Sequence, residues 1–249
     1  METPELKNYN DHLFVQKIVT DYAWFHKHSG SEPLKESYCL KVYAALNRVK
    51  NILVTLQHSR VMLAEINIIS DENYHSTLSK ATVKRYHIEV YFLRLTTYKD
   101  LVIQLIAAVN QWIIPGNNGA GAKLGKLASA VGKTYVAPLL TTLDNMLSTA
   151  KPIRNLIAHE GSTSDPDVLM PELFHDLKAF IETLPSSISR EGIDLPDDNI
   201  FAVYESLATA KSINDMMENE EHMATYLFKL LDTLLPEYRL AIPENHPLI

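Results

Sequence analysis

Glycine is scarce and unevenly placed in this sequence, and its distribution limits the possible folds more than any other feature. The chain of 249 residues contains 8 glycines, and five of them fall between Gly116 and Gly132. Glycine and proline are the residues that most often break helices and form tight turns. Their scarcity elsewhere therefore favours long helices over many-turned β structure. A chain of this length can bury a sizeable core, so we expect an all-α globular protein.

Apolar residues recur at three- and four-residue spacing through most of the chain, which is typical of helices with one buried face. The spacing predicts helices over about 4–28, 33–69, 73–113, 124–131, 135–150, 152–160, 168–184 and 200–235. The expected fold is a single all-helical domain over 1–249, a bundle of long up-down helices. Some of the side chains expected to face the core are Leu13, Leu173, Leu177, Phe180 and Leu207. The tail after Pro236 is expected to be extended.

The composition excludes several classes of protein. One cysteine, Cys39, rules out an intramolecular disulfide and any cysteine-rich metal centre. The first residues are polar and acidic, unlike a secretory signal, and the longest apolar runs are far too short for a bilayer span. We therefore expect a soluble, cytoplasmic protein that does not associate with membranes.

The charge of the chain is distributed in three blocks. Residues 1–79 carry a net −1, residues 80–159 a net +7 and residues 160–249 a net −13, within a total of −7. The basic block could attract a polyanion despite the acidic total, although charge blocks are more often an ordinary solvated surface.

The glycine-rich stretch 115–123 is expected to form a flexible loop. It differs from a phosphate-binding loop because Lys123 does not directly follow the last glycine, no serine or threonine follows that lysine, and the stretch leaves a helix. No cluster of residues at metal-ligand spacing occurs in the chain, so we expect neither a nucleotide cofactor nor a metal.

The segment from Lys151 to Gly161 carries the most distinctive chemistry. At about 100° per residue, its apolar side chains fall on one side of a helix, while Asn155 and His159 share the opposite side. Arg154 lies at one flank, and its side chain is long enough to reach that pair. Histidine can transfer a proton near neutral pH, and arginine can hold a phosphate and neutralise charge in a transition state. Asparagine can orient the substrate or the imidazole. This combination favours metal-free chemistry at a phosphodiester, with the RNA 2′-hydroxyl as the nucleophile.

Arg154-Asn155-x-x-x-His159 resembles the Arg-x(4–6)-His motif of the HEPN superfamily, including the polar residue that follows the arginine. The resemblance covers about 75–185, with accessory helices over 4–70 and 200–235. It implies a helical bundle that dimerises around the motif, and many members are metal-independent endoribonucleases in toxin–antitoxin, phage-defence or RNA-processing systems. By this resemblance Arg154 and His159 are the catalytic pair and Asn155 supports them. Lys123, Lys126, Lys133 and Lys151 are weaker candidates for contacts with RNA.

One histidine per chain is little for a reaction that needs both a base and an acid, and a two-fold dimer would supply a second copy. We therefore expect a homodimeric endoribonuclease, with RNA as substrate and an antitoxin or regulatory protein as a further partner. Two alternatives remain open. One is a non-catalytic HEPN-type module that binds RNA or a protein. The other is a purely structural or assembly role.

Overall fold

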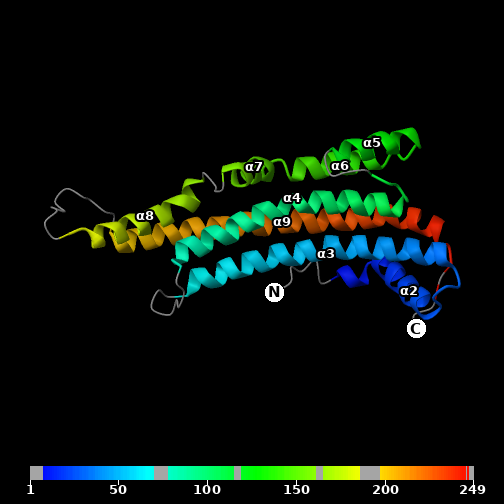
Figure 1. Ribbon diagram of the computed structural model, residues 1–249, viewed down its shortest axis with the longest axis horizontal. Helices are drawn as coiled ribbons and strands as arrows, with labels where there is room; N and C mark the ends of the chain where they lie inside the picture. Colours follow the sequence, from blue (N-terminus) through cyan, green and yellow to red (C-terminus); the bar gives the residue numbers. More distant parts are fainter. Residues whose placement is uncertain are drawn as a thin grey trace. The chain divides into compact units, whose positions relative to one another are not determined.

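The protein is all-α, as the sequence predicts. A computed structural model describes residues 8–69, 78–114, 119–160, 165–185, 197–244 and 246, and these contain no strand (Figure 1). The helices of this part are η1 (Tyr9–Asp11), α2 (Leu13–Lys27), α3 (Pro33–Ile68), α4 (Lys80–Val109), α5 (Ala120–Ala130), α6 (Val136–Met146), α7 (Ala150–Glu160), α8 (Pro166–Thr183) and α9 (Asp198–Ala241). None of them is both long and apolar enough to cross a membrane.

The residues cluster into two compact units. Unit 1 comprises Met1–Gln57, Arg94–Ala150 and Asn219–Ile249, and unit 2 comprises His58–Leu93 and Lys151–Glu218. The long helices α3, α4 and α9 each contribute one part to each unit. The Arg-Asn-x-x-x-His motif, on α7, belongs to unit 2.

Buried tyrosines tie the helices of unit 1 to one another. The Tyr38 hydroxyl donates to the Val109 carbonyl at 2.8 Å, and the Tyr98 hydroxyl donates to the Met223 carbonyl at 3.0 Å. Because a buried hydroxyl without a partner is costly, each bond fixes the position of one long helix against another. The core of unit 1 is therefore mostly apolar, and the hydrogen bonds of its tyrosine hydroxyls determine how the helices pack.

Charged pairs have the corresponding role in unit 2. Lys84 of α4 is 6% exposed, and its ammonium donates to Glu205 of α9 at 2.7 Å and to Asn67 of α3 at 3.0 Å. Arg85 of α4 pairs with Glu172 of α8. These contacts join helices α3, α4, α8 and α9 within the unit.

Helix α4 ends four residues earlier than the sequence predicts, at Val109. The N–H of Trp112 donates to the Ala107 carbonyl at 2.8 Å, and the N–H of Gln111 donates to the Ala108 carbonyl at 3.1 Å. This is the Schellman pattern of helix termination. It requires a left-handed residue, and Gln111 adopts φ 57°. A non-glycine residue in that conformation gives no simple signal in the sequence.

Two predicted helix boundaries are wrong because the helices extend through proline or glycine residues that were expected to end or delay them. Helix α9 continues through Pro236 to Ala241, since the following turns place Tyr238 and Ile242 in the core, both 0% exposed. Their burial offsets the hydrogen bond that proline cannot make. Helix α5 begins at Ala120, so the predicted loop over 115–123 is helical from that residue onward, and residues 115–118 lie outside the described part.

Several side chains expected to face the core are exposed. Leu13, Leu173, Leu177, Phe180 and Leu207 are between 46% and 65% exposed. Other apolar side chains of the same helices are buried; in α8 these include Val168 and Phe174, together with Ile181, which was predicted to face the core. Helix α8 is apolar on both sides, so its sequence pattern does not distinguish the inner side from the outer one.

Candidate functional site

The motif helix, α7, forms because the chain restarts after a turn. Helix α6 ends at Met146, residues 147–149 form a turn, and α7 begins at Ala150. Pro152 lies in the first turn of α7, where backbone N–H groups have no partner within the helix, so the missing donor costs little. The predicted restart is confirmed, although it occurs two residues before the proline.

Helix α7 buries one side and exposes the motif on the other. Ala150 and Ile157 are buried, at 2% and 6% exposure, whereas Asn155 and His159 are exposed. Arg154 lies at the flank and is half-buried. The prediction that Asn155 and His159 project away from the core of their own chain is confirmed.

One hydrogen bond organises the motif. The Arg154 guanidinium donates from Nη1 to Asn155 Oδ1 at 3.1 Å, so the arginine turns toward the exposed side where His159 lies four residues further on. The guanidinium keeps further N–H donors that could bind a phosphate. His159 stands in the last turn of α7. The arrangement offers a proton carrier, a cation and an amide on one accessible helix face.

The four lysines predicted to contact RNA have different environments. Lys151 is exposed on the same side of α7 as Asn155, four residues earlier, and belongs to unit 2. Lys123, Lys126 and Lys133 belong to unit 1, where the first two lie on the exposed side of α5 and Lys133 forms an ion pair with Glu237. Of these four lysines, Lys151 lies on the motif helix α7, and the other three lie in unit 1.

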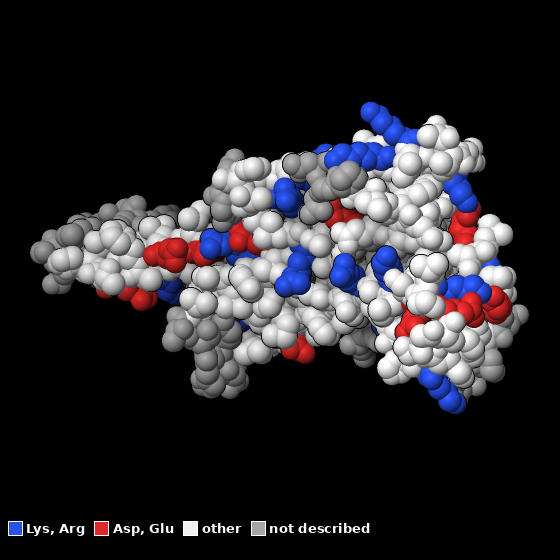
Figure 2. All heavy atoms as spheres, turned by 45° about the vertical axis from the view of Figure 1, so that its right-hand side comes forward, with Lys and Arg blue, Asp and Glu red and all other residues white. Residues whose placement is uncertain are grey.

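Acidic residues pair with much of the predicted basic block. Lys84, Arg85 and Lys133 form ion pairs with Glu205, Glu172 and Glu237 from the acidic C-terminal third. On the face drawn in Figure 2, lysines and arginines are scattered, and several lie beside acidic side chains. The folded chain therefore presents less free positive charge than the net +7 of that block indicates.

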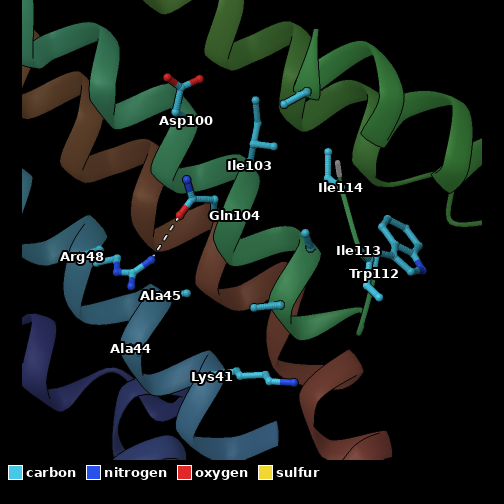
Figure 3. Close-up of a pocket in the computed structure, with 13 residues that line it drawn as sticks. Lys41, Ala44, Ala45, Arg48, Asp100, Ile103, Gln104, Trp112, Ile113 and Ile114 are labelled. Carbon is cyan, nitrogen blue, oxygen red and sulfur yellow. Dashed lines mark hydrogen bonds between the residues drawn. The ribbon is translucent and has the colours of Figure 1, made fainter. Parts of the chain in front are cut away.

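Unit 1 contains a cavity that the sequence did not reveal. Its volume is about 450 Å³, and its walls come from α3, α4, residues 112–114 and Ala120 (Figure 3). Ile103 and Ala107 form part of its apolar lining, while Lys41 and Arg48 bring two cations from α3. The Arg48 guanidinium donates to Gln104 at 3.5 Å.

This cavity has the size and apolar character of a small-molecule site. Its charged lining consists of the cations Lys41 and Arg48 and the carboxylate of Asp100. The sequence shows that Lys41 and Arg48 lie two helical turns apart on α3, but their position opposite Gln104 depends on how α3 packs against α4.

Comparison with known proteins adds no further constraint. No family model, no curated protein and no solved structure matches the chain. Within the residues that the structure describes, no group of three or more His, Cys, Asp or Glu side chains lies close enough together to hold a metal ion.

Proposed function

We propose that the protein is a metal-independent endoribonuclease of the HEPN type, active as a homodimer. The observation that supports this best is the joint placement of Arg154, Asn155 and His159 on the accessible side of α7, with Arg154 hydrogen-bonded to Asn155. A polar cluster of this kind on an exposed helix face is available to a large substrate such as RNA.

In the proposed reaction, the imidazole of His159 accepts the proton of an RNA 2′-hydroxyl. The 2′-oxygen then forms a bond to the adjacent phosphorus, and the bond from phosphorus to the 5′-oxygen breaks. Arg154 neutralises the charge that develops on the phosphoryl oxygens. The leaving 5′-oxygen takes a proton from the second His159 of the dimer, so the products are a 2′,3′-cyclic phosphate and a 5′-hydroxyl.

The test is cleavage of a mixed-sequence RNA by purified protein in EDTA. We expect products that end in a 2′,3′-cyclic phosphate, and no cleavage of an RNA that carries 2′-O-methyl groups throughout. His159→Ala should lower the rate by about 10² to 10⁴-fold, since it removes the proton carrier. Arg154→Lys should also lower the rate, because lysine keeps the charge but not the planar fork of donors.

His222→Ala provides a matched control, because His222 is an exposed histidine on α9, outside the motif. It should cleave at the wild-type rate. Equal activity of the wild type and the His159→Ala variant would show that the motif is not the catalytic site.

The second candidate function is a non-catalytic helical module that binds RNA or a protein. One observation favours it: within the described part of the chain, no hydrogen bond orients the His159 ring, whereas catalytic histidines are commonly held by a third group. A partner that binds equally well to the wild type and to His159→Ala, without turnover of RNA, would support this function.

A further inference from the structure

Helix α8 is apolar on its outer side as well as its inner side. Met170, Leu173, Leu177 and Phe180 recur at spacings of three and four residues, which places them in one stripe along the helix. Their exposed fractions run from 46% to 61%. A helix that is apolar all round is normally covered on every side. Among the described residues of unit 2, these four side chains stay exposed.

The first part of α9 carries a second stripe of the same kind. Ile200, Val203, Tyr204 and Leu207 follow the same helical spacing and are 38% to 69% exposed. The inner side of this segment is buried through Phe201 and Ala208. Both α8 and α9 therefore present an apolar outer side next to a buried inner side.

The two helices lie antiparallel and in contact (Figure 1). The rings of Phe174 and Phe201 stack with their centroids 3.7 Å apart, and Lys178 pairs with Asp198 near one end. At the other end, Asp167 pairs with Lys211. The eight exposed residues thus lie on neighbouring helices.

The contacts with α4 show that both stripes share one surface. Glu172 of α8 and Glu205 of α9 both bind α4, through Arg85 and Lys84 respectively. At 100° per residue, each of these glutamates lies well away from the stripe on its own helix. The two stripes consequently form one apolar surface that faces away from α4. We define the α8–α9 surface as Met170, Leu173, Leu177, Phe180, Ile200, Val203, Tyr204 and Leu207.

The area of the α8–α9 surface is that of a stable protein interface. If a fully exposed side chain of this size presents about 200 Å², the exposed fractions correspond to about 900 Å². The largest apolar patch on a typical monomer is about 300 to 600 Å². A standard interface buries about 800 Å² on each partner.

Charge argues against a nucleic acid or an anionic membrane as the occupant. Residues 165–218 contain 12 acidic residues and three Lys or Arg residues. The surface itself carries no charged side chain, and the ion pairs Lys178–Asp198 and Lys211–Asp167 at its two ends are each neutral as a pair. A second copy of the same surface would therefore bring no charged side chain into the apolar layer itself, while Asp176 lies at its edge on α8.

We propose that the α8–α9 surface is the interface with a second copy of this chain, related to the first by a two-fold axis. Each copy contributes α8 and the first part of α9, so the two pairs enclose a common apolar layer in a four-helix arrangement. The inference deepens the proposed function, on whose homodimer it rests, by naming the surface through which that dimer forms; its evidence comes from side chains of α8 and α9, so the interface and the ribonuclease activity can be tested separately.

The test is the molar mass of the full chain in solution, measured by light scattering and sedimentation equilibrium over a range of concentrations. The wild type should have twice the mass of one chain. Leu173→Glu and Leu207→Glu each place a charge in the apolar layer and should weaken the dimer by at least about 100-fold. Circular dichroism should show unchanged helix content, because both side chains are exposed within their own unit.

Ile68→Glu is the matched control, because Ile68 is an apolar residue of unit 2 that is 82% exposed and lies outside the α8–α9 surface. It should leave the dimer intact, as should His159→Ala. A wild-type monomer at about 100 μM would overturn the inference. So would glutamate variants that dimerise as tightly as the wild type, whether or not the protein shows ribonuclease activity.

Cysteine cross-linking tests the same surface without disrupting it. Cys39 is buried, and burial raises the pKa of its thiol to about 11, so it stays unreactive. We expect at least one of Leu173→Cys, Leu177→Cys, Val203→Cys and Leu207→Cys to form a disulfide-linked dimer on mild oxidation. Leu34→Cys, at an exposed site on α3 in unit 1, should not. Cross-linking of Leu34→Cys alone would count against the proposed interface.

Discussion

Replacement of Glu205 by glutamine should destabilise the protein and remove part of its sensitivity to acid. Burial of the Glu205 carboxyl raises its pKa, but hydrogen bonds from His175 and Lys84, with their positive charges, outweigh burial and lower the pKa from 4.5 to about 2. A lowered pKa means that the folded protein favours the ionised carboxylate. The corresponding stabilisation is present above pH 4.5 and is lost as the pH falls toward 2.

The magnitude follows from the size of the pKa change. Lowering the pKa from 4.5 to about 2 corresponds to about 3 kcal/mol, and partial access of solvent to the pair reduces this to about 2 kcal/mol. Glu205→Gln also leaves the buried Lys84 ammonium without its carboxylate. We therefore expect the free energy of unfolding to fall by about 3 kcal/mol at pH 7.

The assay is urea denaturation of both proteins, followed by circular dichroism between pH 7 and pH 3. Because the wild-type carboxyl becomes protonated at low pH, the stability gap between the two proteins should narrow by about 1 to 2 kcal/mol between pH 6 and pH 3. Glu218→Gln, at an exposed position on α9, should match the wild type throughout. If the difference in unfolding free energy between the two proteins stayed constant from pH 7 to pH 3, the charge of Glu205 would not be the cause. The destabilisation of Glu205→Gln would then come from altered packing.

Two further predictions concern a buried ion pair and the helix ends. Asp21 is 0% exposed and accepts hydrogen bonds from Lys17 and His246, so Asp21→Asn should lower the free energy of unfolding by about 3 to 5 kcal/mol in urea melts. Gln111→Gly should raise the thermal midpoint, by relieving about 1 kcal/mol of left-handed strain, whereas Gly132→Gln should lower it by a similar energy, because Gly132 has φ 72°. A lower thermal midpoint for Gln111→Gly, or a higher one for Gly132→Gln, would contradict the left-handed conformation at these two helix ends.

The long helices could be predicted because their apolar residues repeat over many turns. Helix α3 was predicted over 33–69 and spans Pro33–Ile68, since few residues in that stretch compete with helical geometry. The predicted helix ends and buried helix faces were wrong where two physical signals conflicted. Proline predicted the end of α9 at Pro236, but the burial of Tyr238 and Ile242 extends the helix beyond it. In α8, Leu173, Leu177 and Phe180 were assigned to the buried side and are exposed, because both sides of the helix are apolar, whereas Ile181 is buried as predicted.

The candidate site shows the same division between local and tertiary information. The exposure of Asn155 and His159 depends on helical spacing within α7 and was predictable, whereas the chemistry assigned to them stays a prediction. The cavity between α3 and α4 depends on side chains more than 50 residues apart, such as Arg48 and Gln104, and no local pattern indicates it.

The charge blocks show why linear charge alone is a poor guide to a binding surface. Within each unit, folding brings cations of residues 80–159 against acids of the C-terminal third, as in Lys84 with Glu205 and Lys133 with Glu237. A cation held in such a pair would have to exchange its carboxylate for a phosphate, so it contributes little net affinity for RNA. Recognition of RNA by the motif helix would then depend on contacts from Arg154 and Lys151 rather than on a broad positive field. Two copies of the chain would double those contacts, which gives dimerisation a role in substrate binding as well as in supplying the second histidine.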